Sequence, residues 1–370
     1  MERQLHESGG ATPRQKGPTM KARRCILLVS LPLITMACAR CAMNPAVPNG
    51  IVLMSYNLQT LFDPVDQGGE YPEFKVAGGS WDEKLYRTRL SALAAAMLAG
   101  GVCAAGPAPD VIVVQEAENG RVLRDLASAA GGYPYVVASP DEDSSLACGI
   151  LSRWPPVSAK AHRARSPDGS PPSAARYILE VELDVDGRRL VILAVHLKSK
   201  LGGAAETEPE RRAAAALVRD IARSKTAADP SLALLVMGDF NENPDEFQRV
   251  GGSYPTAMMA PDAGDGQWLT IDGDRSSVSQ GGGVFALFSP WDEAGGYSYR
   301  FQGETERIDH ILLSPSLVSG AGCPFSFDCF SAAPPEFAVD GQGTPIRWNT
   351  GTGSGYSDHL PISARLSMTH

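Results

Sequence analysis

The strongest constraint on the fold is a series of short apolar segments, separated by turns and helices, that end in polar residues. Segments rich in Val, Ile and Leu predict buried strands. They cover residues 51–56, 110–115, 177–185, 190–196, 232–238, 297–301, 308–313 and 362–366. Apolar residues at helical spacing predict helices at 86–98, 122–130 and 208–225. Strands mixed with helices, with some neighbours antiparallel, predict an α/β or α+β layered sandwich.

The segment from 51 to 370 contains no repeat and no linker long enough to separate two domains. We therefore interpret it as a single domain, large enough to bury a sizeable core. The Gly-rich stretch 251–283 and the segment 319–355 are predicted to be long surface loops. Loops of that length are more often functional or mobile than structural.

The N-terminal segment has the pattern of an export signal. Basic residues at 21–24 precede an apolar run over 25–36, which is shorter than the roughly 20 residues that a membrane-spanning helix needs. Because residues 1–19 are polar and fit no signal, we expect translation to start at Met20. We interpret 1–37 as leader and signal peptide, and 38–50 as a tether.

The tetrapeptide Thr35-Met36-Ala37-Cys38 resembles a relaxed bacterial lipobox, whose cysteine is lipidated. The alternative is a plain signal peptide with a chance cysteine. Lipidation at Cys38 predicts a bacterial membrane-anchored lipoprotein, periplasmic or on the cell surface, and the alternative predicts a secreted protein.

Two further cysteines, Cys323 and Cys329, could close a short disulfide loop outside the cytosol, or remain buried free thiols. No paired CxxC pattern occurs, so the sequence predicts no structural zinc site.

Polar residues able to bind a metal or carry a proton follow one predicted strand after another. They are Asn57, Glu116, His196, Asp239, Asn241, Asp309, Asp358 and His359. Each alone has a structural explanation, such as a turn, a cap or a satisfied histidine. Ligand sites of α/β sheets form outside strand ends, so the ordered set predicts one shared pocket. Carboxylate and amide oxygens suit Mg²⁺, and a histidine can move the proton that phosphate ester cleavage requires.

Seven motifs in this set resemble, in order, those of the endonuclease/exonuclease/phosphatase superfamily, which includes deoxyribonuclease I and exonuclease III. The motifs are Tyr56-Asn57-Leu58-Gln59, Gln115-Glu116, Gly149-Ile150-Leu151-Ser152-Arg153, His196-Leu197-Lys198-Ser199-Lys200, Gly238-Asp239-Phe240-Asn241, Arg307-Ile308-Asp309-His310 and Ser357-Asp358-His359-Leu360-Pro361. The resemblance spans about residues 51–368. It implies a four-layered α/β sandwich, in which two packed mixed sheets are flanked by helices.

The resemblance also implies a role for each residue. Asn57 and Glu116 match positions that bind the catalytic Mg²⁺, for which Mn²⁺ could substitute, and Asp358 matches a further carboxylate on the metal side. Asp239 and Asn241 match the pair that positions the nucleophile and contacts the scissile phosphate.

Two histidines match catalytic positions of the family. His359 corresponds to the histidine beside the phosphate, with Asp309 orienting it, and we assign it the general base, a role on which members of the family differ. His196 matches a second histidine, a general acid in the deoxyribonuclease-like branch. Arg176 matches a phosphate-contacting arginine, unless it is a plain strand-edge residue, and Lys198 could draw an anionic substrate inward.

The sequence therefore predicts an exported, metal-dependent phosphodiesterase, a nuclease acting on DNA or RNA, with no obligate protein partner implied. A phosphatase or sphingomyelinase-like phospholipase of the same fold is the alternative, and a non-catalytic binding lipoprotein is a third. The net charge of −9 becomes −13 once residues 1–37, with six basic and two acidic side chains, are removed. That charge disfavours tight, contact-rich binding of duplex DNA.

Overall fold

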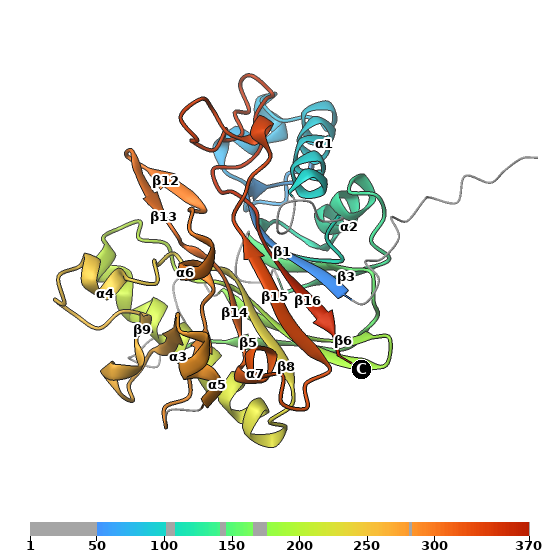
Figure 1. Cartoon of the computed structure of the whole chain (residues 1–370). Helices are drawn as coiled ribbons and strands as arrows, with labels where there is room; N and C mark the ends of the chain where they lie inside the picture. The colour runs from blue at the N-terminus through green and yellow to red at the C-terminus, as the bar shows by residue number, and fades with distance from the viewer. Residues whose placement is uncertain (1–49, 101–107, 141–145, 166–175, 281–282, 370) are drawn as a thin grey trace, which may run out of the picture. The chain divides into compact units, whose positions relative to one another are not determined.

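The computed structural model describes residues 50–100, 108–140, 146–165, 176–280 and 283–369 (Figure 1). The predicted leader, Cys38 and residues 38–49 of the tether lie outside these residues. Within the described part of the chain, no helix is both long enough and apolar enough to cross a membrane.

The first sheet has six strands in the order β15-β16-β1-β2-β4-β3. Within this sheet β1 pairs in parallel with β2 and antiparallel with β16, so the sheet is mixed. The strands are β1 (Gly50–Leu61), β2 (Val111–Ala117), β3 (Tyr135–Ala138), β4 (Ala147–Ser152), β15 (Phe325–Ser331) and β16 (Ile362–Met368).

The second sheet has eight strands in the order β5-β6-β7-β8-β14-β11-β10-β9. It is also mixed, because β7 and β8 run parallel whereas β14 is antiparallel to β8. The strands are β5 (Pro156–Arg163), β6 (Tyr177–Val185), β7 (Arg188–His196), β8 (Ala233–Asp239), β9 (Met258–Met259), β10 (Leu269–Asp272), β11 (Leu287–Phe288) and β14 (Asp309–Leu313). A separate hairpin, β12 (Tyr299–Phe301) and β13 (Glu304–Glu306), stands out from the sheets in Figure 1.

The two sheets pack face to face over one apolar core. Leu53 and Val113 from the first sheet and Ile192, Leu235 and Ile311 from the second belong to this core and are fully buried. Adjacent residues of each strand point to opposite faces, so both sheets also offer an outer apolar face that must be covered.

Helices cover both outer faces. The helices α1 (Glu83–Ala99) and α2 (Gly120–Ala129) pack on the first sheet, and α3 (Ala204–Ala228) packs on the second. Asp82 caps α1 by accepting a hydrogen bond from Leu85 N at 2.8 Å, which is the usual role of an aspartate at this position. Helix, sheet, sheet and helix form the four-layered α/β sandwich that the resemblance implies.

The two segments predicted to be long loops, 251–283 and 319–355, contain regular structure, so this prediction was wrong in part. The first contains β9, β10 and α5 (Arg275–Gln280), and the second contains β15 and a 3₁₀ turn, η4 (Glu336–Ala338). β15 alternates buried aromatic residues with more exposed ones, a strand pattern hidden within a Gly/Pro-rich segment. The remaining short helices are η1 (Pro72–Phe74), η2 (Val76–Gly78), α4 (Glu246–Arg249), η3 (Pro261–Ala263), α6 (Trp291–Ala294) and α7 (Pro315–Ser319).

The suggested Cys323–Cys329 bridge is wrong. Cys323 is a free thiol, 2% exposed, in the core between the sheets. Cys329 is disulfide-bonded, but the other described cysteines, Cys148 and Cys323, are both free. Burial raises the pKa of the Cys323 thiol, so this thiol is the buried, unreactive kind.

Candidate active site

Three adjacent strands of the second sheet bring His196, Asp239 and Asp309 into one row. In the β7–β8 pair His196 lies opposite Asp239, and in the β8–β14 pair Asp309 lies opposite Asp239. Glycine at position 238 permits this close approach, because a Cβ there would clash with the carbonyl oxygen of Val195. Strand register thus joins three residues that are far apart in the sequence.

The first sheet contributes Asn57 and Glu116 to the same place. Asn57 lies opposite Gln115 in the parallel β1–β2 pair, so Glu116 comes next to it. Asn57 Nδ2 donates to Glu116 Oε1 at 3.2 Å and to Asp239 Oδ2 at 3.0 Å. The site therefore lies where the ends of strands from both sheets meet.

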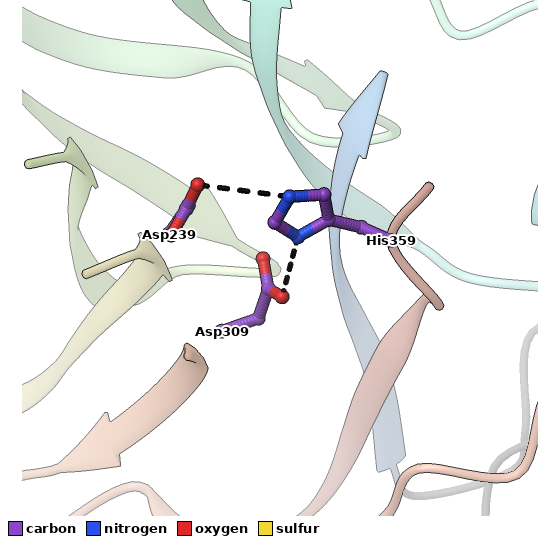
Figure 2. A group of neighbouring side chains, drawn as sticks. All are labelled: Asp239, Asp309 and His359. Carbon is purple, nitrogen blue, oxygen red and sulfur yellow. Dashed lines mark hydrogen bonds and ion pairs between the residues drawn. The ribbon is translucent and has the colours of Figure 1, made fainter. Parts of the chain in front are cut away.

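His359 is held on several sides (Figure 2). Its Nδ1 hydrogen-bonds Asp309 Oδ2 at 2.8 Å, and its Nε2 lies 4.0 Å from Asp239 Oδ2. Its backbone N–H donates to Ser357 Oγ at 3.1 Å, and the ring of Tyr299 lies 4.7 Å from its own, centroid to centroid. Burial alone would lower the pKa of His359, but the Asp309 carboxylate and its hydrogen bond raise it well above the usual value. The geometry favours an imidazolium with Nδ1–H fixed on Asp309 and Nε2–H toward Asp239.

Asp239 is a buried carboxylate with an unusual proton affinity. Burial, followed by repulsion from Asp309, raises its pKa to about 7, although His359 opposes the change. The Asn241 backbone N–H donates to Asp239 Oδ1 at 2.8 Å, and Asn241 Nδ2 donates to the Leu197 carbonyl at 3.1 Å. Asn241 has a φ of 53°, a strained conformation that functional sites often retain.

The Asn57 amide has a fixed orientation. Gln59 N donates to Asn57 Oδ1 at 3.0 Å, so the amide nitrogen, and not the oxygen, faces Glu116 and Asp239. A flipped amide would place its NH₂ against the Gln59 N–H. The structure thus places Asn57 as a donor between two carboxylates, whereas the sequence predicted it as a metal ligand.

Glu116 and Asp358 present carboxylate oxygens to the cleft. Glu116 is held by Thr60 N, which donates to its Oε2 at 2.8 Å, and its own φ is 65°. The Asp358 side chain is 27% exposed, and Arg347 Nη2 lies 4.0 Å from it. An oxygen donor set without a thiolate fits a hard divalent cation such as Mg²⁺ or Mn²⁺.

A second group, Asp239, Asp309 and His359, also has ligand atoms within 4.8 Å of one another. A cation among all three would compete with the hydrogen bond between Asp309 and His359 Nδ1. That bond is short, and it orients the histidine as catalytic dyads do. A cation would therefore fit better on the Glu116 side, where it leaves the hydrogen bond between Asp309 and His359 intact.

A cleft of about 480 Å³ opens over these residues. Its described lining consists of Glu116, His196, Ser199, Lys200, Leu201, Gly202, Asp239, Asn241, Tyr299, Phe301, Glu306, Ile308, Asp358 and His359. Six of the eight predicted catalytic and metal residues are therefore within reach of one ligand: Glu116, His196, Asp239, Asn241, Asp358 and His359. Asn57 and Asp309 lie behind them.

His196 lies on the cleft floor between two carboxylates. Its Nε2 is 3.5 Å from Asp239 Oδ2 and 3.6 Å from Glu116 Oε1, and its buried Nδ1 has no hydrogen-bond partner in the described part of the chain. Burial, followed by repulsion from Arg176, lowers the pKa of His196 well below its usual value. His196 is therefore neutral near pH 7, in contrast to His359.

The two predicted substrate-binding cations lie apart from this cleft. Arg176 and Lys198 line a neighbouring small cavity of about 30 Å³, which shares His196 with the cleft. Arg176 Nη1 donates to the Leu197 carbonyl. Lys200 lines the cleft instead, but its Nζ lies 2.6 Å from Glu246 Oε1.

Arg89 supports the backbone behind the site. The sequence predicts no role for it beyond a structural one. It is fully buried and lies over the rings of Phe74 and Trp348, 5.6 and 5.1 Å from their centroids. Its Nη2 donates to the carbonyls of Leu58 (2.7 Å) and Gln59. Burial lowers its pKa to about 9. Arg89 thus holds the turn of β1 that positions Asn57 and Glu116.

Comparison with known families agrees with this geometry. Residues 52–255 match the Endonuclease/Exonuclease/phosphatase family, over more than half of the chain. The chain therefore belongs to this family, as its ordered motifs predicted. No significant match is found among curated protein sequences.

Solved structures show the same fold. A truncated TDP2 from Caenorhabditis elegans superposes with a TM-score of 0.52 at 17% identity, covering 86% of this chain and 98% of that one. A mannosyl-6-phosphatase from Bacteroides thetaiotaomicron gives 0.50 at 16% identity, covering 86% and 100%. An endonuclease/exonuclease/phosphatase family protein from the same organism gives 0.50 at 16%, covering 87% and 99%. At these identities the likeness concerns the fold alone.

Proposed function

We propose that the chain is a divalent-metal-dependent phosphoesterase that hydrolyses phosphodiester bonds, with residues 51–370 as its catalytic domain. The observation that carries the proposal is the buried Asp309–His359 pair facing Asp239, which the Asn57 amide joins to Glu116. Family membership supports phosphoester hydrolysis, and the oxygen-rich donor set supports a cation. When bound, the cation would neutralise charge on the phosphate oxygens.

Asp239 and His359 carry out different proton transfers. Asp239, which has a pKa of about 7 and accepts hydrogen bonds from Asn241, accepts the proton of the attacking water. His359, held charged by Asp309, donates Nε2–H to the phosphate and can protonate the leaving oxygen. The water oxygen bonds to phosphorus as the P–O bond of the leaving group breaks. We thus assign the base to Asp239 and not to His359.

A substrate panel tests this function. The purified chain is incubated with plasmid DNA, RNA, sphingomyelin, inositol phosphates and simple phosphodiesters, each with Mg²⁺, with Mn²⁺ or with chelator. We expect hydrolysis that chelator abolishes and metal restores. Activity that persists in chelator excludes the cation, and cleavage of monoesters alone favours the phosphatase alternative. A wild type that is inactive throughout favours the binding lipoprotein.

We also propose that the protein is exported and anchored to the membrane through lipid on Cys38. The disulfide at Cys329 supports this proposal, because disulfides persist mainly in oxidising compartments. Membrane fractionation of wild type and Cys38→Ala, with mass spectrometry of the N-terminus, tests it. A soluble wild type cleaved at another residue contradicts the anchor.

A further inference from the structure

The wall of the cleft next to His359 is aromatic. β12 joins the active site through a bridge between Tyr299 and His359, and Leu360 N donates to the Ser298 carbonyl at 2.7 Å. Tyr299 and Phe301 are two residues apart on this strand, so both project from the same face. Their rings are nearly parallel, 14° apart, with centroids separated by 6.5 Å.

This arrangement extends an aromatic surface from the catalytic histidine to the rim of the cleft. Tyr299 contacts the His359 ring, and Phe301 continues outward on the hairpin, where it is 53% exposed. Leu201, in the segment between β7 and α3, also lines the cleft and is 84% exposed. Single exposed apolar side chains are common, but these two border a cleft that contains the reacting groups.

The charges of the cleft favour a substrate with few phosphates. Four carboxylates line it: Glu116, Asp239, Glu306 and Asp358. Among the described lining residues Lys200 is the one Lys or Arg, and Glu246 neutralises it at 2.6 Å. A polyanionic strand is bound mainly by cationic side chains, so this lining suits an ester with a single phosphoryl group and an uncharged substituent.

We propose that Tyr299, Phe301 and Leu201 form a subsite for a flat aromatic substituent of the phosphoester. The subsite rests on the proposed function, since it presupposes a phosphoryl group at His359 and Asp239. The aromatic ring stacks on Phe301 and on the edge of Tyr299, while Leu201 closes over it. A nucleobase of a small nucleotide ester or a simple aryl group supplies such a ring.

Matched diesters test the subsite. Bis(para-nitrophenyl) phosphate and methyl para-nitrophenyl phosphate share a leaving group and differ in the group that remains. We expect Phe301→Ala to lower kcat/KM for the aryl diester about tenfold, and for the methyl diester less than about twofold. Phe301→Tyr should keep the preference. Val157→Ala, which removes a 62% exposed side chain on β5, is the matched control and should change neither value.

The remaining outcomes separate the subsite from the proposed function. An equal loss on both diesters overturns the subsite, as does no loss on either. Loss of kcat/KM on thymidine para-nitrophenyl phosphate as well identifies a nucleobase as an accepted ring.

A binding experiment needs no turnover: calorimetry compares phenylphosphonate with methylphosphonate in the presence of Mg²⁺. If wild type cleaves no ester but prefers phenylphosphonate, and Phe301→Ala removes that preference, the subsite stands and the proposed function falls. Equal binding of both phosphonates overturns the subsite.

Discussion

Two buried clusters of charged side chains each take one member from the same short stretch of chain, Asp239 and Glu242, and serve different purposes. One is the active-site cluster of Asp239, Asp309 and His359, and the other is a network of Arg211, Glu208 and Glu242. In the network Arg211 Nη2 lies 2.7 Å from Glu208, and its Nε lies 3.1 Å from Glu242. All six side chains are less than one-tenth exposed.

The clusters differ in how their polar atoms are used. Each nitrogen of the Arg211 guanidinium has a partner, including the carbonyls of Lys198 (3.2 Å) and Ala204 (2.6 Å) at the ends of a segment that borders the cleft. Each cluster nevertheless has one buried carboxylate oxygen without a hydrogen-bond partner among the described residues, Asp309 Oδ1 in the active site and Glu208 Oε1 in the network. The difference lies in access, because His359 and Asp239 open onto the cleft, whereas Arg211, Glu208 and Glu242 are not among its described lining residues. Burial of charge therefore does not mark function by itself. Access of the buried charged groups to a ligand does.

The largest expected effect is on turnover in the active-site cluster. His359→Ala and Asp239→Asn should each lower kcat by about 10²- to 10⁴-fold, because proton transfer is typically worth that much. The double variant should be little worse than the worse single one, since residues of one catalytic unit are not additive. Single-turnover kinetics with thermal melts measure both properties. Folded single variants with near-wild-type rates would show that these residues are not catalytic.

Arg211→Met should have the opposite signature. Removing the guanidinium leaves the buried Glu208 carboxylate uncompensated and takes a hydrogen-bond donor from Glu242, so we expect the free energy of unfolding to fall by about 3–5 kcal/mol. Turnover of the folded fraction should change much less than in His359→Ala. Urea unfolding measures the loss. Arg87→Met is the control, because its side chain is 67% exposed and its substitution should change stability by no more than about 0.5 kcal/mol. Equal effects of the two substitutions would contradict a structural network.

Substitutions of Asn57 sharpen the contrast between ligand and supporting donor. If Asn57 holds Glu116 and Asp239 by donation, Asn57→Ala should raise the Mg²⁺ concentration for half-maximal activity by about 10- to 100-fold, as removal of supporting residues does. Asn57→Asp should be no better, because its carboxylate would repel the other two. A metal titration of activity distinguishes the two roles. Tighter Mg²⁺ binding by Asn57→Asp would instead identify position 57 as a ligand.

The smallest effect concerns the pH dependence of stability. Burial, followed by the neighbouring Glu208, raises the pKa of Glu242 to about 9. The folded state therefore binds a proton that the unfolded state releases near pH 4.5, so this contribution is lost as the pH rises toward 9. Glu242→Gln imitates the protonated carboxyl and should flatten the fall in the free energy of unfolding between pH 6 and 9, by up to about 1 kcal/mol per pH unit, as measured by urea unfolding at each pH. Parallel pH profiles of the two proteins would refute the assignment.

Much of the fold and of the site could be predicted from local pattern. Apolar runs indicated β1, β2, β6, β7, β8, β14 and β16 because buried strands need continuous apolar side chains. The order of polar residues after them indicated a common site, since strand ends of layered sheets converge. β15 was missed because its aromatic alternation is interrupted and lies among turn-forming residues.

What the tertiary structure decided was the use of each side chain. The sequence alone determined which residues are available at strand ends: Asn57, Glu116, His196, Asp239 and Asp309. Register then placed His196 and Asp309 on either side of Asp239, and the Gln59 N–H turned the Asn57 amide toward the carboxylates. Packing buried two arginines, Arg89 and Arg211, that resemble surface residues in the sequence, and it placed Phe301 at the rim of the cleft. Local pattern reports strand and helix content because those depend on near neighbours, whereas proton affinity and orientation depend on groups brought together from distant parts of the chain.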